Sequence, residues 1–410
     1  MKIALISYEF AGVSGGGGIG TYVRNAVRML LAGGHTVHLF TSGEADSRKE
    51  PELGLTVTKL AGLREAFGAR AGEAFAAEWM LMPFDVLEGP EFECDAADAA
   101  ARVPQVPLVV RLHGPSFTIA QSNAAYVSTR SSLRFGLGAL RRGHWPRNPW
   151  RFDPLTDPER AHAISADLIV ANSHATANTC LNFWGLSGQR LETVRYPFMP
   201  QPSLLELKIT SESRTILFLG KLEVRKGVIE LARAVQQVVN AVPDARFQFV
   251  GRSIPHPDDG RPVAAHVREL VSRCSSHVEI IEAVPYHEVP KFFANAAICA
   301  FPSDWEASGF VCMEGMAAAR AVVGSSAGGM SEIIEEGRTG WLVPPRSPAA
   351  IAKAIIALLG DPARRAAMGE AARERVMSAY APHVILPLQI AAYERAIARA
   401  AARDPLQRYQ

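Results

Sequence analysis

The stretch that decides the fold is residues 303–332, which read SDWEASGFVCMEGMAAARAVVGSSAGGMSE. It follows a short apolar run, residues 297–301, which we expect to form a buried parallel strand. Residues 310–320 are rich in Ala and Met and contain no Pro, so they are predicted to be helical. Glu306 would then lie in the strand-to-helix loop, and Glu314 near the start of the helix. In an open α/β sheet, this edge is where ligands bind.

The start of the predicted helix is suited to an anionic ligand. Ser308, Gly309 and Phe310 would present backbone N–H groups there, at the positive end of the helix dipole. Gly309 has no side chain, so a ligand could come close to the backbone. This position therefore predicts a binding site for a phosphate-bearing molecule.

Strands separated by helical segments occur in two series along the chain. The second series begins after residues 196–202, a YPFMPQP stretch with the composition of a domain linker. The pattern predicts an α/β protein with two Rossmann-like halves, each a mostly parallel sheet with helices on both faces. The expected strands are residues 2–8, 35–40, 56–60, 84–87, 107–112, 167–171 and 191–196, then 215–219, 247–250, 278–281, 297–301, 321–323 and 341–343.

The composition of the 410 residues is that of an ordinary globular protein, with a net charge of +2. The five cysteines are scattered and form no C-x-x-C pair, which favours reduced thiols and a cytoplasmic location. The N-terminus enters a strand at once, so no signal peptide is expected. No run reaches the ~20 apolar residues that span a bilayer. With no recognised module, nucleic acid is not an expected partner.

Two positively charged side chains and a histidine follow predicted strands. Lys221 and Lys226 lie between the strand at 215–219 and a helix, where two cations and a helix dipole would form a diphosphate site. His113 ends the apolar strand at 107–112, which would place it at the ligand-binding edge.

The glycine-rich loop at 15–20 formally matches G-x-G-x-x-G. About six residues separate it from its strand, and no acid ends the second strand, so a dinucleotide fingerprint is disfavoured. No Gly-Lys-Ser/Thr follows, so it is not a phosphate-binding P-loop either.

Two further stretches have both a functional and an ordinary interpretation. Glu88 and Glu91 end a predicted strand and could bind acceptor hydroxyls, or could belong to a plain turn. Residues 133–151 interleave arginines with aromatic residues and contain no acid. They suit an anionic membrane surface or a phosphorylated acceptor, or form a solvated helix and loop.

The order of these features resembles glycosyltransferase family 4, the retaining nucleotide-sugar transferases of the GT-B fold. The resemblance rests on the E-x7-E pair Glu306 and Glu314 after a strand ending in Pro-Ser, followed by residues 327–329. It implies two Rossmann-like domains facing a central cleft, with a C-terminal helix crossing back to the first domain. We accordingly expect an acceptor domain at 1–198, a donor domain at 203–383 and the crossing helix at 384–410.

The resemblance also implies roles for particular residues. His113, Glu306 and Lys226 would be the catalytic residues, with Lys221 standing where the family usually has Arg. Glu314 would bind the ribose hydroxyls. The expected donor-binding set is Gly17, Gly18, Lys221, Lys226, Arg252, Val284, Glu306, Ser308, Gly309, Phe310 and Glu314.

The implied reaction moves a sugar from a nucleoside diphosphate sugar to an acceptor hydroxyl with retention of configuration. UDP is the first candidate for the nucleotide, with GDP and ADP as alternatives, and the product would serve cell-surface polysaccharide or glycolipid synthesis. No D-x-D occurs and nothing clusters like a metal site, so neither a metal nor another cofactor is expected. A GT-B nucleotide-sugar epimerase and a non-catalytic partner subunit remain alternatives. Contact through residues 133–151 would place the protein at the cytoplasmic face of the inner membrane.

Overall fold

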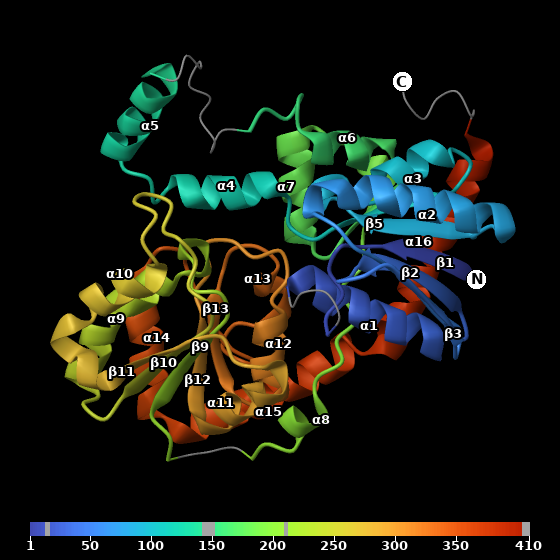
Figure 1. Ribbon diagram of the computed structural model, residues 1–410. Coiled ribbons are helices and arrows are strands. Elements are labelled where there is room, and N and C mark those ends of the chain that lie inside the picture. Colours follow the sequence, from blue (N-terminus) through green and yellow to red (C-terminus); the bar gives the residue numbers. More distant parts are fainter. Residues whose placement is uncertain (13–16, 142–151, 209–211, 404–410) are drawn as a thin grey trace. The chain divides into compact units, whose positions relative to one another are not determined.

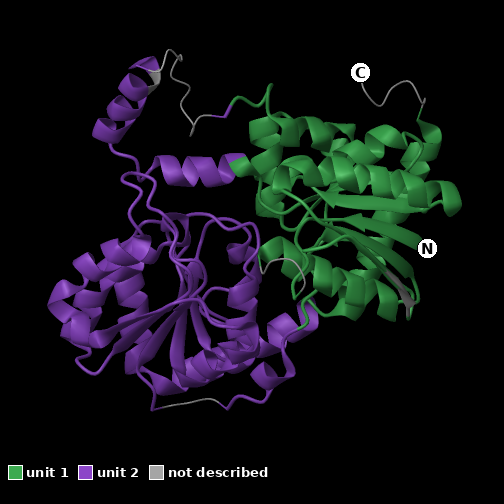
Figure 2. Ribbon diagram, in the orientation of Figure 1, with its two compact units in different colours: residues 1–116, 153–199, 380–410 green, residues 117–152, 200–379 purple. Residues whose placement is uncertain are grey.

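The computed structural model describes residues 1–12, 17–141, 152–208 and 212–403. The chain divides into two compact units (Figure 2). Unit 1 comprises residues 1–116, 153–199 and 380–410, and unit 2 comprises residues 117–152 and 200–379. Each unit contains one mostly parallel sheet with helices packed on it, which confirms the predicted fold class (Figure 1).

The sheet of unit 1 has the strand order β3-β4-β2-β1-β5-β6-β7-β8. Its described pairs are parallel except that of β3 with β4. The sequence did not predict β3, because SRKEPE is charged, contains Pro and has no apolar alternation; such a strand is tolerated at a sheet edge. The strands are β1 (Lys2–Ile6), β2 (Thr36–Ser42), β3 (Ser47–Glu52), β4 (Leu55–Leu60), β5 (Val86–Pro90), β6 (Leu108–Leu112), β7 (Leu168–Ala171) and β8 (Leu191–Thr193).

The last helix of the chain belongs to unit 1, where it packs against β5, β6, β7 and the first helix. It begins two residues before the expected start, and residues 404–410 of the expected helix lie outside the described residues. The α-helices of unit 1 are α1 (Gly18–Ala32), α2 (Phe67–Leu81), α3 (Ala97–Arg102), α6 (Pro158–Ser165), α7 (His174–Trp184) and α16 (Pro382–Ala402). Helix α4 (Ser116–Ala124) begins at the last residue of the first segment of unit 1.

Glu88 is the centre of a buried polar cluster that ties α16 to the sheet. Its carboxylate accepts hydrogen bonds from Tyr22 Oη at 2.5 Å, Tyr393 Oη at 2.9 Å and Gln389 Nε2 at 3.0 Å. The fully buried guanidinium of Arg111 lies 3.5 Å from the same carboxylate. Buried charges persist in a fold only when they are paired and hydrogen-bonded in this way.

The sheet of unit 2 has the strand order β11-β10-β9-β12-β13-β14, with every described pair parallel. Its strands are β9 (Thr215–Leu219), β10 (Arg246–Val250), β11 (Val278–Ile281), β12 (Ala296–Phe301), β13 (Ala321–Ser325) and β14 (Trp341–Val343). Its helices, besides most of α4, are α5 (Thr129–Arg141), α8 (Pro202–Leu205), α9 (Val228–Ala241), α10 (Val263–Leu270), α11 (Val289–Asn295), α12 (Phe310–Ala317), α13 (Met330–Ile333), α14 (Pro348–Gly360) and α15 (Pro362–Ala379).

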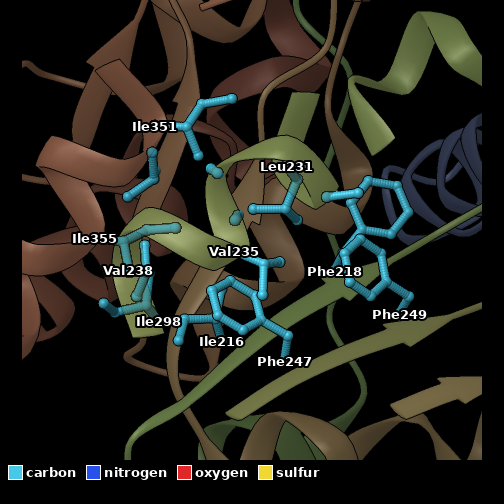
Figure 3. Close-up of a cluster of buried hydrophobic side chains, with 14 of the residues drawn as sticks. Ile216, Phe218, Leu231, Val235, Val238, Phe247, Phe249, Ile298, Ile351 and Ile355 are labelled. Atoms are coloured by element: carbon cyan, nitrogen blue, oxygen red, sulfur yellow. The ribbon is translucent and has the colours of Figure 1, made fainter. Parts of the chain in front are cut away.

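Alternate residues of the unit 2 strands face opposite sides of the sheet. Ile216 and Phe218 of β9 join the apolar cluster that α9 and α14 cover, with Leu231 and Ile355 among its members (Figure 3). On the other side, Gly315 of α12 lies against the strand β12. Fully burying one Leu or Ile side chain contributes roughly 1.5–3 kcal/mol, so this cluster holds the strands of unit 2 in place.

Residues 117–152 group with unit 2, whereas the predicted domain limits placed them in the first domain. Tyr126 Oη donates to Glu230 Oε2 at 3.0 Å, and Ser128 donates from its backbone N–H and its hydroxyl to Asp258 Oδ1 at 2.7 and 2.8 Å. These contacts attach residues 125–128, the α4–α5 connection, to the rest of unit 2. The sequence of this connection does not predict them.

We predict that Glu88→Ala destabilises unit 1 by about 3–5 kcal/mol, because Arg111 would remain buried without its charged partner. Glu192→Ala is the matched control, since it breaks an exposed ion pair with Arg395 of the same helix α16. That pair is expected to contribute about 0–1 kcal/mol. Urea unfolding of both variants measures the difference, and equal losses would contradict a structural role for Glu88.

Candidate functional site

The order of strands in unit 2 reverses between β9 and β12. Strands β10 and β11 continue from β9 in one direction, and β13 and β14 continue from β12 in the other. Such a switch point leaves a crevice outside the carboxyl ends of the two strands, where ligands bind in open α/β sheets. The loops that follow β9 and β12 carry Lys226 and Glu306.

Lys226 and Glu306 meet at this switch point. Lys226 ends the short 3-10 helix Val224–Lys226, and its Nζ donates to Glu306 Oε2. Arg225 lies 3.9 Å from the same oxygen and also pairs with Glu223 at 2.8 Å. The side chains of Lys226 and Glu306 are 24% and 15% exposed, so the pair is reachable from solvent. Arg225 adds a third cation to Lys221 and Lys226, the two that the sequence predicted for a phosphate group.

Two glycines allow the loops around this pair to approach each other. Gly227 has φ +72°, and a Cβ there would lie 2.0 Å from the carbonyl oxygen of Pro302. Gly328 has φ +70°, and its Cβ would lie 2.3 Å from the carbonyl oxygen of Glu306, which also accepts a hydrogen bond from Gly329 N–H at 2.7 Å. Glu306 is thus held by the backbone that follows β13.

Helix α12 begins directly after this loop, with Gly309 at its N-cap. Ser308 and Phe310 beside it are half-buried. The positive end of the α12 dipole therefore lies on the same loop as Glu306. Glu314 follows in the second turn, is nearly buried, and accepts a hydrogen bond from Tyr286 Oη at 3.2 Å.

The ends of β10 and β11 lie on the other side of β9. A Cβ on Gly251 would lie 1.9 Å from the carbonyl oxygen of Gly220, so the ends of β9 and β10 pack backbone to backbone. Arg252 and Lys221 follow these glycines and are exposed, and Val284 is half-buried after β11. Tyr286 was not among the predicted site residues, although its place just after β11 was visible in the sequence.

A buried polar group that the sequence did not reveal lies next to Glu306. Asp304 Oδ2 accepts from Arg346 Nε at 2.8 Å, and Asp304 Oδ1 accepts from Tyr126 Oη at 3.3 Å. Burial raises the pKa of Asp304 and of Glu230, which is the other partner of Tyr126. This group fixes the start of the loop that carries Glu306.

In unit 1, the strand order reverses between β1 and β5. His113 follows the neighbouring strand β6 and is half-buried, with Nδ1 2.5 Å from Tyr196 Oη and the ring 5.0 Å from that of Tyr22. Burial, and secondarily the charge of Arg111, hold the pKa of His113 well below its usual 6.5. The imidazole is therefore neutral near pH 7, when it can donate or accept a hydrogen bond.

Gly17 and Gly18 lie at the start of α1, after β1. A Cβ on Gly17 would lie 2.3 Å from Glu9 Oε2, the oxygen that accepts Gly20 N–H at 3.3 Å. Apart from its chain neighbours and the backbone of α1, no described residue comes within 4 Å of a Cβ built on Gly18. Gly17 therefore serves the close approach of Glu9, while Gly18 leaves room at the helix start.

The structure does not support acceptor binding by Glu88 or Glu91. Glu88 is the buried centre of the cluster described above. Glu91 is fully buried and accepts three backbone hydrogen bonds, from His113 N–H at 2.7 and 2.9 Å and from Gly114 N–H at 2.8 Å. Both side chains stabilise the fold: Glu88 ties α16 to the sheet, and Glu91 holds the backbone of His113 in place. A sequence shows that an acid ends a strand but not that it turns inward.

Part of the basic and aromatic stretch at 133–151 is described. Residues 142–151, with Trp145 and Trp150, lie outside the described residues. The remainder belongs to α5, which exposes Leu133, Leu137 and Leu140. No helix within the described ranges is both long and apolar enough to cross a bilayer.

These two sheets, each with a switch point, define a GT-B-type α/β protein. Two family profiles match the chain: Glycosyltransferase Family 4 over residues 16–196 and Glycosyl transferases group 1 over residues 213–361. The chain therefore belongs to glycosyltransferase family 4 and is an enzyme that transfers a sugar.

Individual relatives agree with this assignment. The α-maltose-1-phosphate synthase of Mycolicibacterium smegmatis is 26% identical over 321 residues, which cover 71% of this chain and 82% of the relative. The sucrose-phosphate synthase of Thermosynechococcus elongatus has a similar fold, with a TM-score of 0.74 and 23% identity over 97% of this chain and 99% of that one. HepE of Anabaena, solved in complex with UDP, has a TM-score of 0.66 and 18% identity over 95% of this chain and 98% of that one.

We predict that Gly328→Ala disturbs the site while Gly337→Ala does not. Both glycines have left-handed φ, at +70° and +75°, so each substitution costs ~1–2 kcal/mol of backbone strain. Only at Gly328 would the new methyl also displace the Glu306 carbonyl, at a further 1–3 kcal/mol or so. Urea unfolding measures this difference. Equal free energies of unfolding for the two variants would mean that the loop around Glu306 moves to accommodate the new methyl group.

Proposed function

We propose that the protein binds the nucleoside diphosphate part of a sugar nucleotide at the β9–β12 switch point of unit 2, and transfers the sugar to an acceptor hydroxyl with retention. The observation that carries this proposal is the meeting of Lys226 and Arg225 with Glu306 beside the start of α12. Cations and a helix N-terminus stabilise a leaving diphosphate, and a carboxylate binds sugar hydroxyls.

In this proposal the phosphates bind Lys226, which donates to Glu306 in the structure. Glu306 then accepts hydrogen bonds from hydroxyls of the donor sugar, with the backbone of Gly309 and Phe310 beside it. Glu314 accepts hydrogen bonds from the ribose hydroxyls, where it now accepts one from Tyr286. Lys221, Arg252, Val284 and Ser308 complete the proposed donor site in unit 2. Binding of the diphosphate by Gly17 and Gly18 stays a prediction from the sequence.

The proposed reaction proceeds on one face of the sugar. The bond between the anomeric carbon and the β-phosphate oxygen breaks, a bond from the acceptor oxygen to that carbon forms, and the leaving phosphate takes the acceptor proton. His113, neutral near pH 7, is proposed to contact the donor sugar at the reacting centre. The chemistry requires no metal in this scheme.

We predict that one nucleoside diphosphate raises the melting temperature of the protein and that Glu314→Ala abolishes the shift. A ligand at ~100 times its dissociation constant adds roughly 2.7 kcal/mol to the free energy of unfolding. A thermal-shift panel of UDP, GDP and ADP measures this, with UDP first because HepE was solved with it. Glu269→Gln is the control, since Glu269 is exposed and pairs with Arg261.

No shift with any nucleotide at millimolar concentration would contradict the donor site and favour a non-catalytic subunit. With the nucleotide known, release of an epimerised sugar in the absence of acceptor would instead identify an epimerase.

We also propose that α5 brings the enzyme to the cytoplasmic face of an anionic membrane, where a lipid-linked or polysaccharide precursor is the acceptor. Leu133, Leu137 and Leu140 are 68%, 59% and 52% exposed and lie on one stripe of the helix. Arg130, Arg134 and Arg141 form the adjoining stripe, and α5 contains no acid. Exposed leucines beside arginines suit an interfacial helix on anionic lipid. The five unpaired cysteines support a reducing compartment.

We predict that the protein binds phosphatidylserine-containing vesicles and that replacing the three α5 leucines by Ser weakens this binding roughly tenfold or more, because each buried Leu contributes roughly 1.5–3 kcal/mol. Replacing Leu53, Leu63 and Leu81 by Ser is the control, since these are 93%, 78% and 81% exposed elsewhere. Vesicle flotation measures both. Equal binding of the two triple variants, or no binding of the wild type, would contradict the membrane proposal and leave a soluble acceptor.

A further inference from the structure

The loop between β10 and α10 brings together three side chains of metal-ligating type. His256 and Asp259 come from the loop, and His266 comes from α10. One ligand atom from each lies within 4.8 Å of the others, the one such group among the residues that the structure describes. This group was not predictable from the sequence, because H-x2-D-x6-H is not a known metal-binding spacing. None of the three belongs to the proposed donor site.

The distances within this group are close to those that a shared ion requires. His266 Nε2 lies 3.2 Å from Asp259 Oδ1 and 3.1 Å from Oδ2, and His256 Nδ1 lies 3.9 Å from Oδ1. The two imidazole rings are 4.4 Å apart. Tetrahedral coordination with bonds of about 2.0–2.1 Å separates neighbouring ligand atoms by ~3.3 Å. A small rotation of His256 would therefore bring all three ligands to one ion.

A neighbouring backbone group orients one of the ligands, since Asp259 Oδ1 accepts a hydrogen bond from Arg261 N–H at 3.0 Å. Contacts from outside the ligand set that orient ligands in this way are characteristic of protein metal sites. His256 Nδ1 accepts a hydrogen bond from Asp258 N–H at 3.2 Å, so it has the lone pair that a metal needs, and an ion would replace this contact. The histidine side chains are 12% and 21% exposed, and that of Asp259 is 35% exposed, so an ion can enter from solvent.

We propose that His256, Asp259 and His266 bind a divalent transition metal of the zinc class. Two imidazole nitrogens and one carboxylate oxygen suit Zn²⁺, Co²⁺ or Ni²⁺, whereas Mg²⁺ and Ca²⁺ prefer oxygen ligands alone. With three protein ligands, water completes the tetrahedron. In this proposal the ion links the loop to α10 and takes no part in the transfer reaction.

A metal ion at this site would also stabilise the segment that precedes α5. It joins residues 256–259 to α10, and Asp258 of the same loop accepts hydrogen bonds from Ser128 at the start of α5. The His256 ring also lies 6.3 Å from that of Tyr126. Binding of the ion therefore strengthens the attachment of the α4–α5 connection to unit 2.

The test uses the full chain after chelator treatment, without nucleotide, in equilibrium dialysis against ZnCl₂ with metal analysis. We expect one Zn²⁺ per chain that His266→Gln binds at least about tenfold more weakly. His287→Gln is the matched control, because His287 is an exposed histidine of the same unit. Co²⁺ should give visible absorption of tetrahedral intensity in the wild type and the control, and not in the variant. Circular dichroism and melting without metal establish that both variants are folded.

Equal zinc binding by the wild type and His266→Gln would overturn the proposal, and so would the absence of zinc binding by the wild type. Either result would leave Asp259 and His266 as a plain hydrogen-bonded pair. Asp259→Asn gives a second reading if His266→Gln does not fold: retention of full zinc affinity by this variant would likewise overturn the site. Because the test contains no nucleotide, its result is independent of the proposed transfer activity.

Discussion

The buried parallel sheet of unit 2 brings Lys226 into contact with Glu306. This contact joins the loops after β9 and β12, two strands that are neighbours in the sheet but 77 residues apart in the chain, from Leu219 to Ala296. A partly exposed ion pair contributes only about 0–1 kcal/mol to folding. Its geometry is therefore imposed by what surrounds it: the buried strands, the glycines at 227 and 328, and the polar group of Asp304, Arg346 and Tyr126.

Buried charge plays a different role in unit 1. Glu88 and Arg111 lie inside the fold and tie α16 to the sheet, while the buried Glu91, whose pKa burial raises to about 8, holds the backbone of His113. The unfavourable free energy of removing these groups from water is offset by the hydrogen bonds that they make. Burial, and secondarily the charge of Arg111, keep the imidazole of His113 neutral near pH 7.

Much of this arrangement follows from the sequence, because parallel sheets buried on both faces leave continuous apolar runs followed by polar loops. The strands β9, β11 and β14 have the expected limits, and the loop that carries Glu306 lies where the run at 297–301 ends. Contacts between distant segments were not predictable. Such contacts leave no periodic pattern in the sequence. Examples are the burial of Glu88, the hydrogen bond from Tyr126 to Glu230, and the contact of His256 with His266. The edge strand β3 was missed because its composition is that of a loop.

The most direct test of the central claim is the rate at which Lys226→Ala releases nucleoside diphosphate from the sugar nucleotide that the protein binds. If Lys226 stabilises the leaving diphosphate, the rate falls by about 10²–10³, as it does when a comparable stabilising donor is removed. Lys291→Ala, which removes an exposed lysine paired with Glu288, should retain the full rate. A Lys226→Ala rate within about threefold of wild type, well short of the ~10² expected for such a donor, would contradict the assignment of this switch point as the site of sugar transfer.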